Sequence, residues 1–109
     1  MDDCLFCRIA GGKMGTEFVY ENRDAVVFAD ISPQAPVHLL VVPREHVADI
    51  TSAPPQMLGR LFQAATEAAA RVGLDQFRLV VNTGRDAGQT VFHLHIHLLG
   101  GRSMTWPPG

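Results

Sequence analysis

The sequence lacks an excess of charge of either sign and lacks any long apolar run. Its 109 residues carry 9 basic and 11 acidic side chains, for a net charge of −2, with no basic stripe of the kind that binds nucleic acid. No apolar run approaches the roughly 20 residues of a membrane-spanning helix. The stretch Met1–Cys4 is acidic and lacks the pattern of a signal peptide. We therefore expect a cytoplasmic protein that binds neither nucleic acid nor a membrane.

Cysteine is scarce as well, since the chain has only Cys4 and Cys7, in a Cys-x-x-Cys spacing. In a cytosolic chain this pair indicates metal binding or redox chemistry more than a structural disulfide. Redox pairs of this type usually follow a strand, and the N-terminus leaves no room for one. Two thiols are half of a structural zinc site, so zinc and a plain helix start remain alternatives.

Hydrophobic residues make up 47% of the chain, which is enough for the core of one domain over residues 1–109. Apolar alternation predicts strands at residues 17–21, 25–29, 38–42, 77–81 and 90–99. The third of these is nearly continuous in apolar character, which indicates a central strand. From about residue 100 onward we expect an irregular tail.

Two helices are predicted. A short one covers Leu5–Ala10, and a long one begins at Pro54–Pro55, with Thr51 or Ser52 as its cap, and ends at Gly73. The expected fold class is α+β: a five-stranded, mostly antiparallel sheet with one long helix and a short N-terminal helix.

The most informative stretch is residues 93–99, where His93, His95 and His97 alternate with apolar residues. On a strand, all three imidazoles would leave one face and the apolar side chains the other. Neighbouring histidines would lie about 6.6 Å apart and the outer pair about 13 Å apart. Because zinc–nitrogen bonds measure about 2.0–2.1 Å, His93 and His97 should serve different sites. A histidine-rich polar face without chemistry is the alternative.

The loop that precedes these histidines, residues 84–90, contains two glycines and can aim backbone N–H groups at an anion. Taken alone, the loop is better explained as an ordinary hairpin connection. Its position directly before the histidine strand favours a phosphate site.

With these motifs, the chain resembles the histidine-triad (HIT) nucleotide-binding proteins, in particular their Hint branch. The tail after the triad separates this resemblance from the dinucleotide hydrolases and the galactose-1-phosphate uridylyltransferases. The resemblance implies a HIT-like fold and a homodimer. The segments that carry it are residues 30–33, 88–92, 93–99, 100–102 and 106–109.

The resemblance implies a purine nucleoside phosphoramidase, which cleaves the P–N bond of an adenosine 5′-phosphoramidate. His95 would be the nucleophile and would form a covalent nucleotidyl-histidine that water then hydrolyses. His97 and Thr90 would contact the phosphate or the departing amine, and His38 would help to orient the nucleophile. Taken without the resemblance, His38 would be a core histidine on an apolar strand.

The same resemblance implies a site for a purine nucleoside monophosphate or phosphoramidate. Asp30 would accept the ribose hydroxyls, although a carboxylate before Ser-Pro is also a common loop cap. Ile31 would pack on the base. The implied nucleotide-binding residues are Asp30, Ile31, Asn82, Gly88, Gln89, Thr90, His95 and His97.

A structural zinc site is implied through Cys4, Cys7, His46 and His93, a Cys₂His₂ set suited to a closed tetrahedron. Catalysis should not need this metal. Two other functions stay open: a nucleotide-binding regulatory module with little turnover, and a zinc-dependent hydrolase with the triad as metal ligands.

Overall fold

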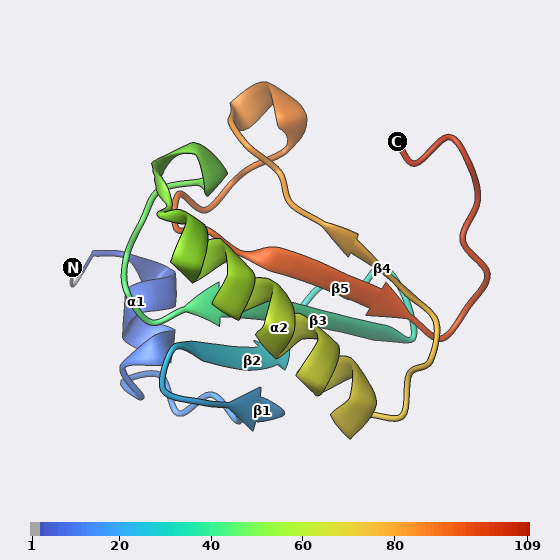
Figure 1. Cartoon of the computed structure of the whole chain (residues 1–109), viewed down its shortest axis with the longest axis horizontal. Helices are drawn as coiled ribbons and strands as arrows, with labels where there is room; N and C mark the ends of the chain where they lie inside the picture. The colour runs from blue at the N-terminus through green and yellow to red at the C-terminus, as the bar shows by residue number, and fades with distance from the viewer. Residues whose placement is uncertain (1–2) are drawn as a thin grey trace.

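The computed structural model describes residues 3–109 and has an α+β architecture (Figure 1). Short 3₁₀ turns at Ile50–Ser52 and Arg85–Ala87 interrupt the loops. The helices and strands are α1 Leu5–Ala10, β1 Tyr20–Glu21, β2 Ala25–Ala29, β3 Val37–Pro43, α2 Pro55–Arg71, β4 Phe77–Val80 and β5 Ile96–Gly100. The predicted domain also takes in Met1 and Asp2, which lie outside the described residues.

Within residues 3–109 the strands form one sheet in the order β1-β2-β3-β5-β4, with every neighbouring pair antiparallel. The predicted central position of the third strand is confirmed, because β3 lies between β2 and β5. In this register His97 of β5 lies opposite Leu40 of β3 and Val80 of β4. The middle of the sheet therefore carries the last histidine of the triad.

The two faces of the sheet are covered by different helices (Figure 1). Helix α2 packs Leu61 and four buried alanines on one face, where small side chains let the helix approach the strands closely. Helix α1 packs Phe6 and Ile9 on the other face, against the alternate side chains of β2 and β3. Because α1 is only six residues long, it leaves part of that second face uncovered.

The long helix begins differently from the prediction. Asp49 accepts the backbone N–H of Thr51 and caps the 3₁₀ turn that precedes the helix. Helix α2 itself starts at Pro55, after Pro54, without a side-chain cap. The expectation that Thr51 or Ser52 caps α2 is therefore wrong, because the two prolines already supply a helical start that needs fewer N–H partners.

Two predicted strands are shorter in the structure. The strand expected over residues 17–21 is reduced to Tyr20–Glu21, and the one expected over residues 90–99 begins only at Ile96. A strand needs a neighbour, and β4 pairs with β5 only from Phe77 to Val80. The backbone N–H of Leu94 instead donates to the carbonyl of Val47, 2.8 Å away. None of the helices described is both long and apolar enough to cross a membrane.

Candidate functional site

Residues 93–98 send their side chains to alternating sides even before β5 begins. Leu94, Ile96 and Leu98 are buried in the core under α2. The histidines turn to the other side, where His93 meets the cysteines and His95 and His97 line a pocket. The division of the triad between two sites, which the spacing predicted, is what the structure has.

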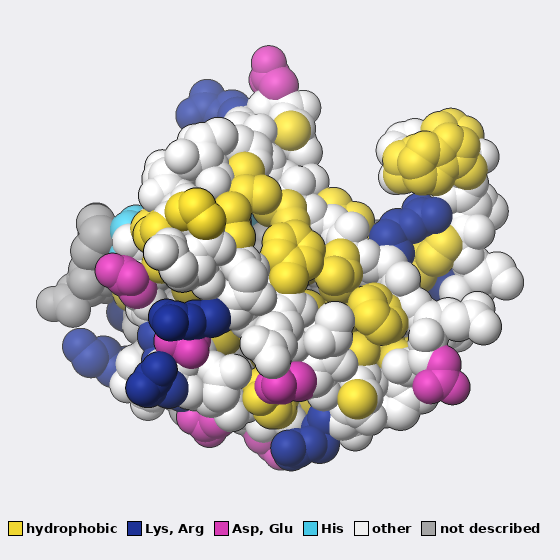
Figure 2. Space-filling model, in the orientation of Figure 1, with side chains coloured by type: hydrophobic (Ala, Val, Ile, Leu, Met, Phe, Trp, Pro, Cys, Tyr) yellow, Lys and Arg dark blue, Asp and Glu magenta, His cyan; other side chains and the backbone are white. Residues whose placement is uncertain are grey.

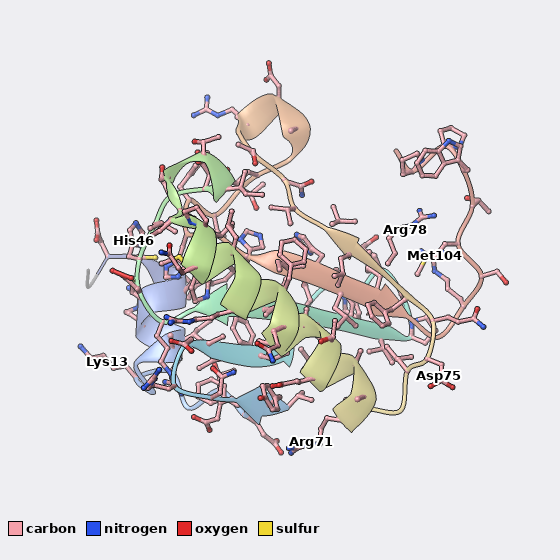
Figure 3. The ribbon with its side chains drawn as sticks, viewed as in Figure 1. Lys13, His46, Arg71, Asp75, Arg78 and Met104 are labelled. Atoms are coloured by element: carbon pink, nitrogen blue, oxygen red, sulfur yellow. The ribbon has the colours of Figure 1, made fainter. Side chains whose placement is uncertain are left out.

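At one end of α1 the predicted zinc ligands converge. The Cys4 and Cys7 sulfurs lie 3.4 and 3.5 Å from His93 Nδ1, and His46 Nδ1 lies 3.3 Å from the Cys7 sulfur and 3.1 Å from His93 Nδ1. All four ligand atoms lie within 4.8 Å of one another. Ligands around tetrahedral zinc are separated by about 3.3–3.8 Å, given bonds of about 2.0–2.3 Å. Figure 3 shows His46 at this end of the sheet, beside α1.

His93 is held in the form that a metal ligand requires. Its ring is fully buried, and its Nε2–H donates to the Pro43 carbonyl at 2.8 Å. The neutral ring therefore turns an unprotonated Nδ1 toward the cysteines, with the backbone support that metal-binding histidines usually have. Burial lowers the pKa of His93 and raises that of the Cys7 thiol, with the Cys4 sulfur adding to the latter shift. The donor set fits Zn²⁺.

A pocket of about 420 Å³ opens beside α1 on the same face of the sheet. Its walls combine apolar side chains from α1, β2 and β3 with polar groups from the loop before the triad and from the triad itself. The lining residues are Leu5, Phe6, Ile9, Thr16, Phe28, Ala29, Asp30, Ile31, Leu40, Asn82, Gly88, Thr90, Val91, His95 and His97.

His95 presents an unprotonated nitrogen in this pocket. Its Nδ1–H donates to the His93 carbonyl at 2.8 Å, so the neutral ring keeps its lone pair on Nε2. Burial lowers the pKa of His95, which keeps the ring neutral at pH 7. The Phe6 ring meets it edge-on, with centroids 5.0 Å apart. The arrangement suits a nucleophile.

His97 is oriented by a chain of hydrogen bonds that starts at a backbone amide. The Gln34 N–H donates to His38 Nδ1 at 3.0 Å, so the proton of the neutral His38 ring lies on Nε2. That Nε2–H donates to His97 Nδ1 at 2.9 Å, which leaves His97 with an N–H at Nε2. The structure thus joins His38 to His97, whereas the resemblance implied contact with the nucleophile. His95 is oriented by the His93 carbonyl instead.

The hydrogen-bond chain also decides against a second metal site. Asp30, His38 and His97 place ligand atoms within 4.8 Å of one another, with the Asp30 carboxylate 3.5 Å from His38 Nε2. A metal at His38 Nε2 would have to displace the proton that the Gln34 amide keeps there. The hydrogen-bond chain therefore argues against a metal held by Asp30, His38 and His97.

Most of the predicted nucleotide-binding residues line the pocket. Asp30 lies on its wall and also accepts the Ser32 N–H at 2.8 Å, so the loop-capping interpretation is confirmed alongside. Ile31 is 97% exposed at the rim. Asn82, Gly88 and Thr90 of the loop before the triad also line the pocket. Gly88 adopts a positive φ of 97°, which favours glycine.

Gln89 differs from this group because its side chain is buried and turned away from the pocket. Its amide donates to the carbonyls of Ala48 and Val91, at 2.8 and 3.1 Å, and accepts from the Gly84 N–H at 2.9 Å. Gln89 therefore holds the shape of the loop that carries Gly88 and Thr90. Any role in nucleotide binding passes through that loop.

Several site residues were not predicted. Leu5, Phe6 and Ile9 come from the same short helix as the cysteines, and their apolar spacing was the available signal. The contributions of Gln34 and Pro43 are made by backbone atoms, so the side-chain sequence gives no sign of them.

The chain is similar to known proteins in both sequence and structure. The HIT domain family matches residues 12–104. A HIT-like protein of Synechocystis sp. is 46% identical over 99% of this chain and 98% of its own length. A HIT family hydrolase from Legionella pneumophila has a similar structure, with a TM-score of 0.93 and 44% identity, covering 98% of this chain and all of that one. The predicted HIT-like fold is thereby confirmed.

A third similar protein bears on the cysteine cluster. It is a Zn-bound histidine triad family protein from Mycobacterium smegmatis, with 31% identity, a TM-score of 0.84, and coverage of 93% of this chain and 76% of its own.

Proposed function

This chain belongs to the HIT family, and on that premise we propose that it cleaves the P–N bond of adenosine 5′-phosphoramidates through a nucleotidyl-histidine. HIT family proteins bind nucleotides, and the similar Legionella protein is a HIT family hydrolase. The phosphoramidate substrate and the Hint branch are part of the proposal. They rest on the motifs before and after the triad.

The observation that carries the proposal is the tautomer of His95. A neutral imidazole with a free Nε2 in a pocket is a nucleophile that needs no deprotonation at pH 7. His97 is less suited to this role, since its Nδ1 already accepts a hydrogen bond from His38.

In the first step His95 Nε2 attacks the α-phosphorus, and the bond from phosphorus to the amine nitrogen breaks. The electron pair of that bond leaves with the amine, which takes up a proton. The His97 Nε2–H and the Thr90 hydroxyl, both in the pocket lining, would donate to the phosphate oxygens or to the amine. A backbone N–H from the loop at Gly88 would add to them.

In the second step water attacks the phosphorus of the nucleotidyl-histidine and the bond to His95 Nε2 breaks, and the proton that the water loses replaces the one that the amine took up. AMP is released, and His95 returns to its neutral form with its Nδ1–H still donated to the His93 carbonyl. The ribose hydroxyls would lie against the Asp30 carboxylate, and the purine would pack between Ile31 and the apolar wall from α1.

The cysteine cluster would hold zinc outside this reaction. Cys4, Cys7, His46 and His93 would be its ligands, and a closed four-ligand site supplies stability rather than a reactive position. No step above involves the metal.

We further propose that the protein is a cytoplasmic homodimer. Phe62 of α2, Val72 directly after α2 and Phe77 of β4 expose 36–37% of their surface. Figure 2 shows hydrophobic side chains gathered along α2. Exposed apolar patches of this kind commonly mark protein interfaces. Sedimentation at micromolar concentration should give twice the 11.9 kDa chain mass, and a monomer would contradict the proposal.

The enzymatic proposal is tested by incubating the protein with adenosine 5′-monophosphoramidate and following AMP release. We expect turnover by the wild type and a loss of roughly 10³-fold or more in His95→Ala. Tight AMP binding without turnover would favour the regulatory module. Activity that is lost on chelation within seconds, and restored by zinc, would favour the metal-dependent hydrolase.

A further inference from the structure

Helix α1 belongs to both sites at once. Cys4 caps the helix, with its sulfur accepting the Cys7 N–H at 3.4 Å, and both thiols point into the metal-binding cluster. Leu5, Phe6 and Ile9 of the same helix form the apolar wall of the pocket. A change in the position of α1 therefore reaches both sites.

The helix has little to hold it in place on its own. It has six residues, well below the length at which an isolated helix is stable in water. Its packing comes from the buried Phe6, Ile9 and Ala10 on one side. Its further contacts include a hydrogen bond from Arg44 Nη1 to the Ala10 carbonyl at 3.4 Å and the approach of its two thiols to His46 and His93.

His93 provides a second connection between the sites. Its ring lies among the cysteines, while its carbonyl accepts the His95 Nδ1–H at 2.8 Å. The Phe6 ring lies edge-on to both imidazoles, 6.0 Å from His93 and 5.0 Å from His95 between centroids. Displacing the His93 ring would thus move the carbonyl that sets the tautomer of His95.

We propose that the Cys4, Cys7, His46 and His93 cluster, when it holds zinc, controls nucleotide binding in the pocket and keeps His95 in its reactive tautomer. Without the metal, two thiols and two imidazoles lose their common partner, so the connection between α1 and residues 93–95 is weakened. The ligands then act as positioning residues for the nucleophile. The inference rests on the proposed function only in taking the pocket as the nucleotide site.

His46 offers the sharpest test, because it belongs neither to α1 nor to the pocket lining. His46→Ala removes one ligand, whereas His46→Cys gives a Cys₃His set, which is also a known type of zinc site. The three proteins are prepared with equimolar zinc, and their bound zinc is measured. AMP affinity is then measured by calorimetry, and the His95 tautomer by ¹⁵N NMR of the ring nitrogens.

We expect His46→Ala to lose stoichiometric zinc, to bind AMP about tenfold more weakly and to show mixed His95 tautomers. His46→Cys should keep zinc, AMP affinity and a single tautomer with the proton on Nδ1. If His46→Cys fails to hold zinc, it must behave like His46→Ala. As a control for general destabilisation, Leu61→Ala in the opposite core should melt lower yet keep the tautomer.

The proposal is overturned if His46→Ala lacks zinc but retains wild-type AMP affinity and one His95 tautomer. It is equally overturned if the wild type takes up no zinc, or if zinc-loaded His46→Cys behaves like the metal-free protein. None of these readouts needs P–N cleavage. A wild type that binds AMP but does not hydrolyse the phosphoramidate would therefore contradict the proposed function and leave this inference standing.

Discussion

His93, His95 and His38 each use one ring nitrogen to contact a backbone group, and these contacts set their roles. Pro43 and His93 supply carbonyl acceptors, and Gln34 supplies an amide donor. Rings of the same chemistry thus suit the proposed roles of metal ligand and nucleophile, and in His38 a donor to His97. The backbone groups around the site set the tautomer of each ring, since an isolated imidazole prefers neither of its two tautomers strongly.

The triad and the cysteine pair could be read from the sequence, and the resemblance supplied seven of the fifteen residues that line the pocket. Spacing alone separates His93 from His97, because side-chain distances on extended chain are fixed by geometry. The hydrogen bond between His38 and His97 and the burial of the Gln89 side chain could not be predicted. Both depend on where loop amides and carbonyls lie, which the identity of a side chain does not determine.

At the residue scale, acid should destabilise the fold through the buried imidazoles. Burial, with His95 and His38 adding to it, lowers the pKa of His97 from 6.5 to about 4. The unfolded chain therefore takes up this proton as the pH falls below 6.5, while the folded chain does not. The free energy of unfolding should fall between pH 6.5 and 4, by up to about 3 kcal/mol from His97.

Denaturant unfolding across this range, with chelator present so that metal release adds nothing, measures the effect. His97→Gln should show a shallower dependence on pH than the wild type. Equal slopes for the two proteins would contradict the assignment.

At the element scale, the site depends on how β5 leaves the sheet. Gly101 follows β5 directly with a φ of 90°, and a Cβ there would lie 2.9 Å from Pro36 Cβ. Arg102 next donates to the Gln34 carbonyl at 3.2 Å. The residues directly after β5 thus contact the loop whose Gln34 amide orients His38.

Replacing Gly101 should therefore cost more than its backbone strain alone. We expect Gly101→Ala to lower the free energy of unfolding by about 2–4 kcal/mol, from strain at positive φ and the contact with Pro36. Gly12→Ala is the matched control, since Gly12 has a φ of 77° and no atom within 4 Å of its added Cβ. Gly12→Ala should lower the free energy of unfolding by only about 1 kcal/mol. Equal losses by thermal or urea unfolding would show that the contact with Pro36 does not matter.

The strand prediction shows what periodicity can and cannot determine. Alternation correctly places Leu94, Ile96 and Leu98 on the α2 side, although only the last two lie in β5. Pairing requires a neighbour of sufficient length, and β4 is too short to extend the ladder to residue 90. Side-chain pattern determines the face, whereas partner strands determine the ends.

At the scale of the whole molecule, the sheet is covered by α2 on one face and by α1 with the pocket on the other. The fold class followed from composition and periodicity because one long amphipathic helix and a set of short strands allow few packed arrangements. The proposed coupling of the two sites through α1 did not follow from them, since it depends on contacts between residues 86 and 89 positions apart in the chain.

Metal removal should lower the stability of the whole fold. A ligand that binds only the folded chain stabilises it by about 4 kcal/mol when present at a thousand times its dissociation constant. We therefore expect chelation of the zinc-loaded protein to lower its melting temperature by several degrees or more. His46→Ala should melt at the lower temperature with or without chelator. An unchanged wild-type melting curve would argue against zinc at this cluster.

The central claim is that His95 Nε2 becomes covalently bonded to the nucleotide. Rapid acid-free quenching of the enzyme with an adenosine 5′-phosphoramidate, followed by peptide mass spectrometry, tests it most directly. We expect one adenylyl group on the peptide that contains His95, and no adenylyl group on that peptide in His95→Ala. Turnover of substrate by His95→Ala at the wild-type rate, or an adenylyl group on another residue, would contradict it.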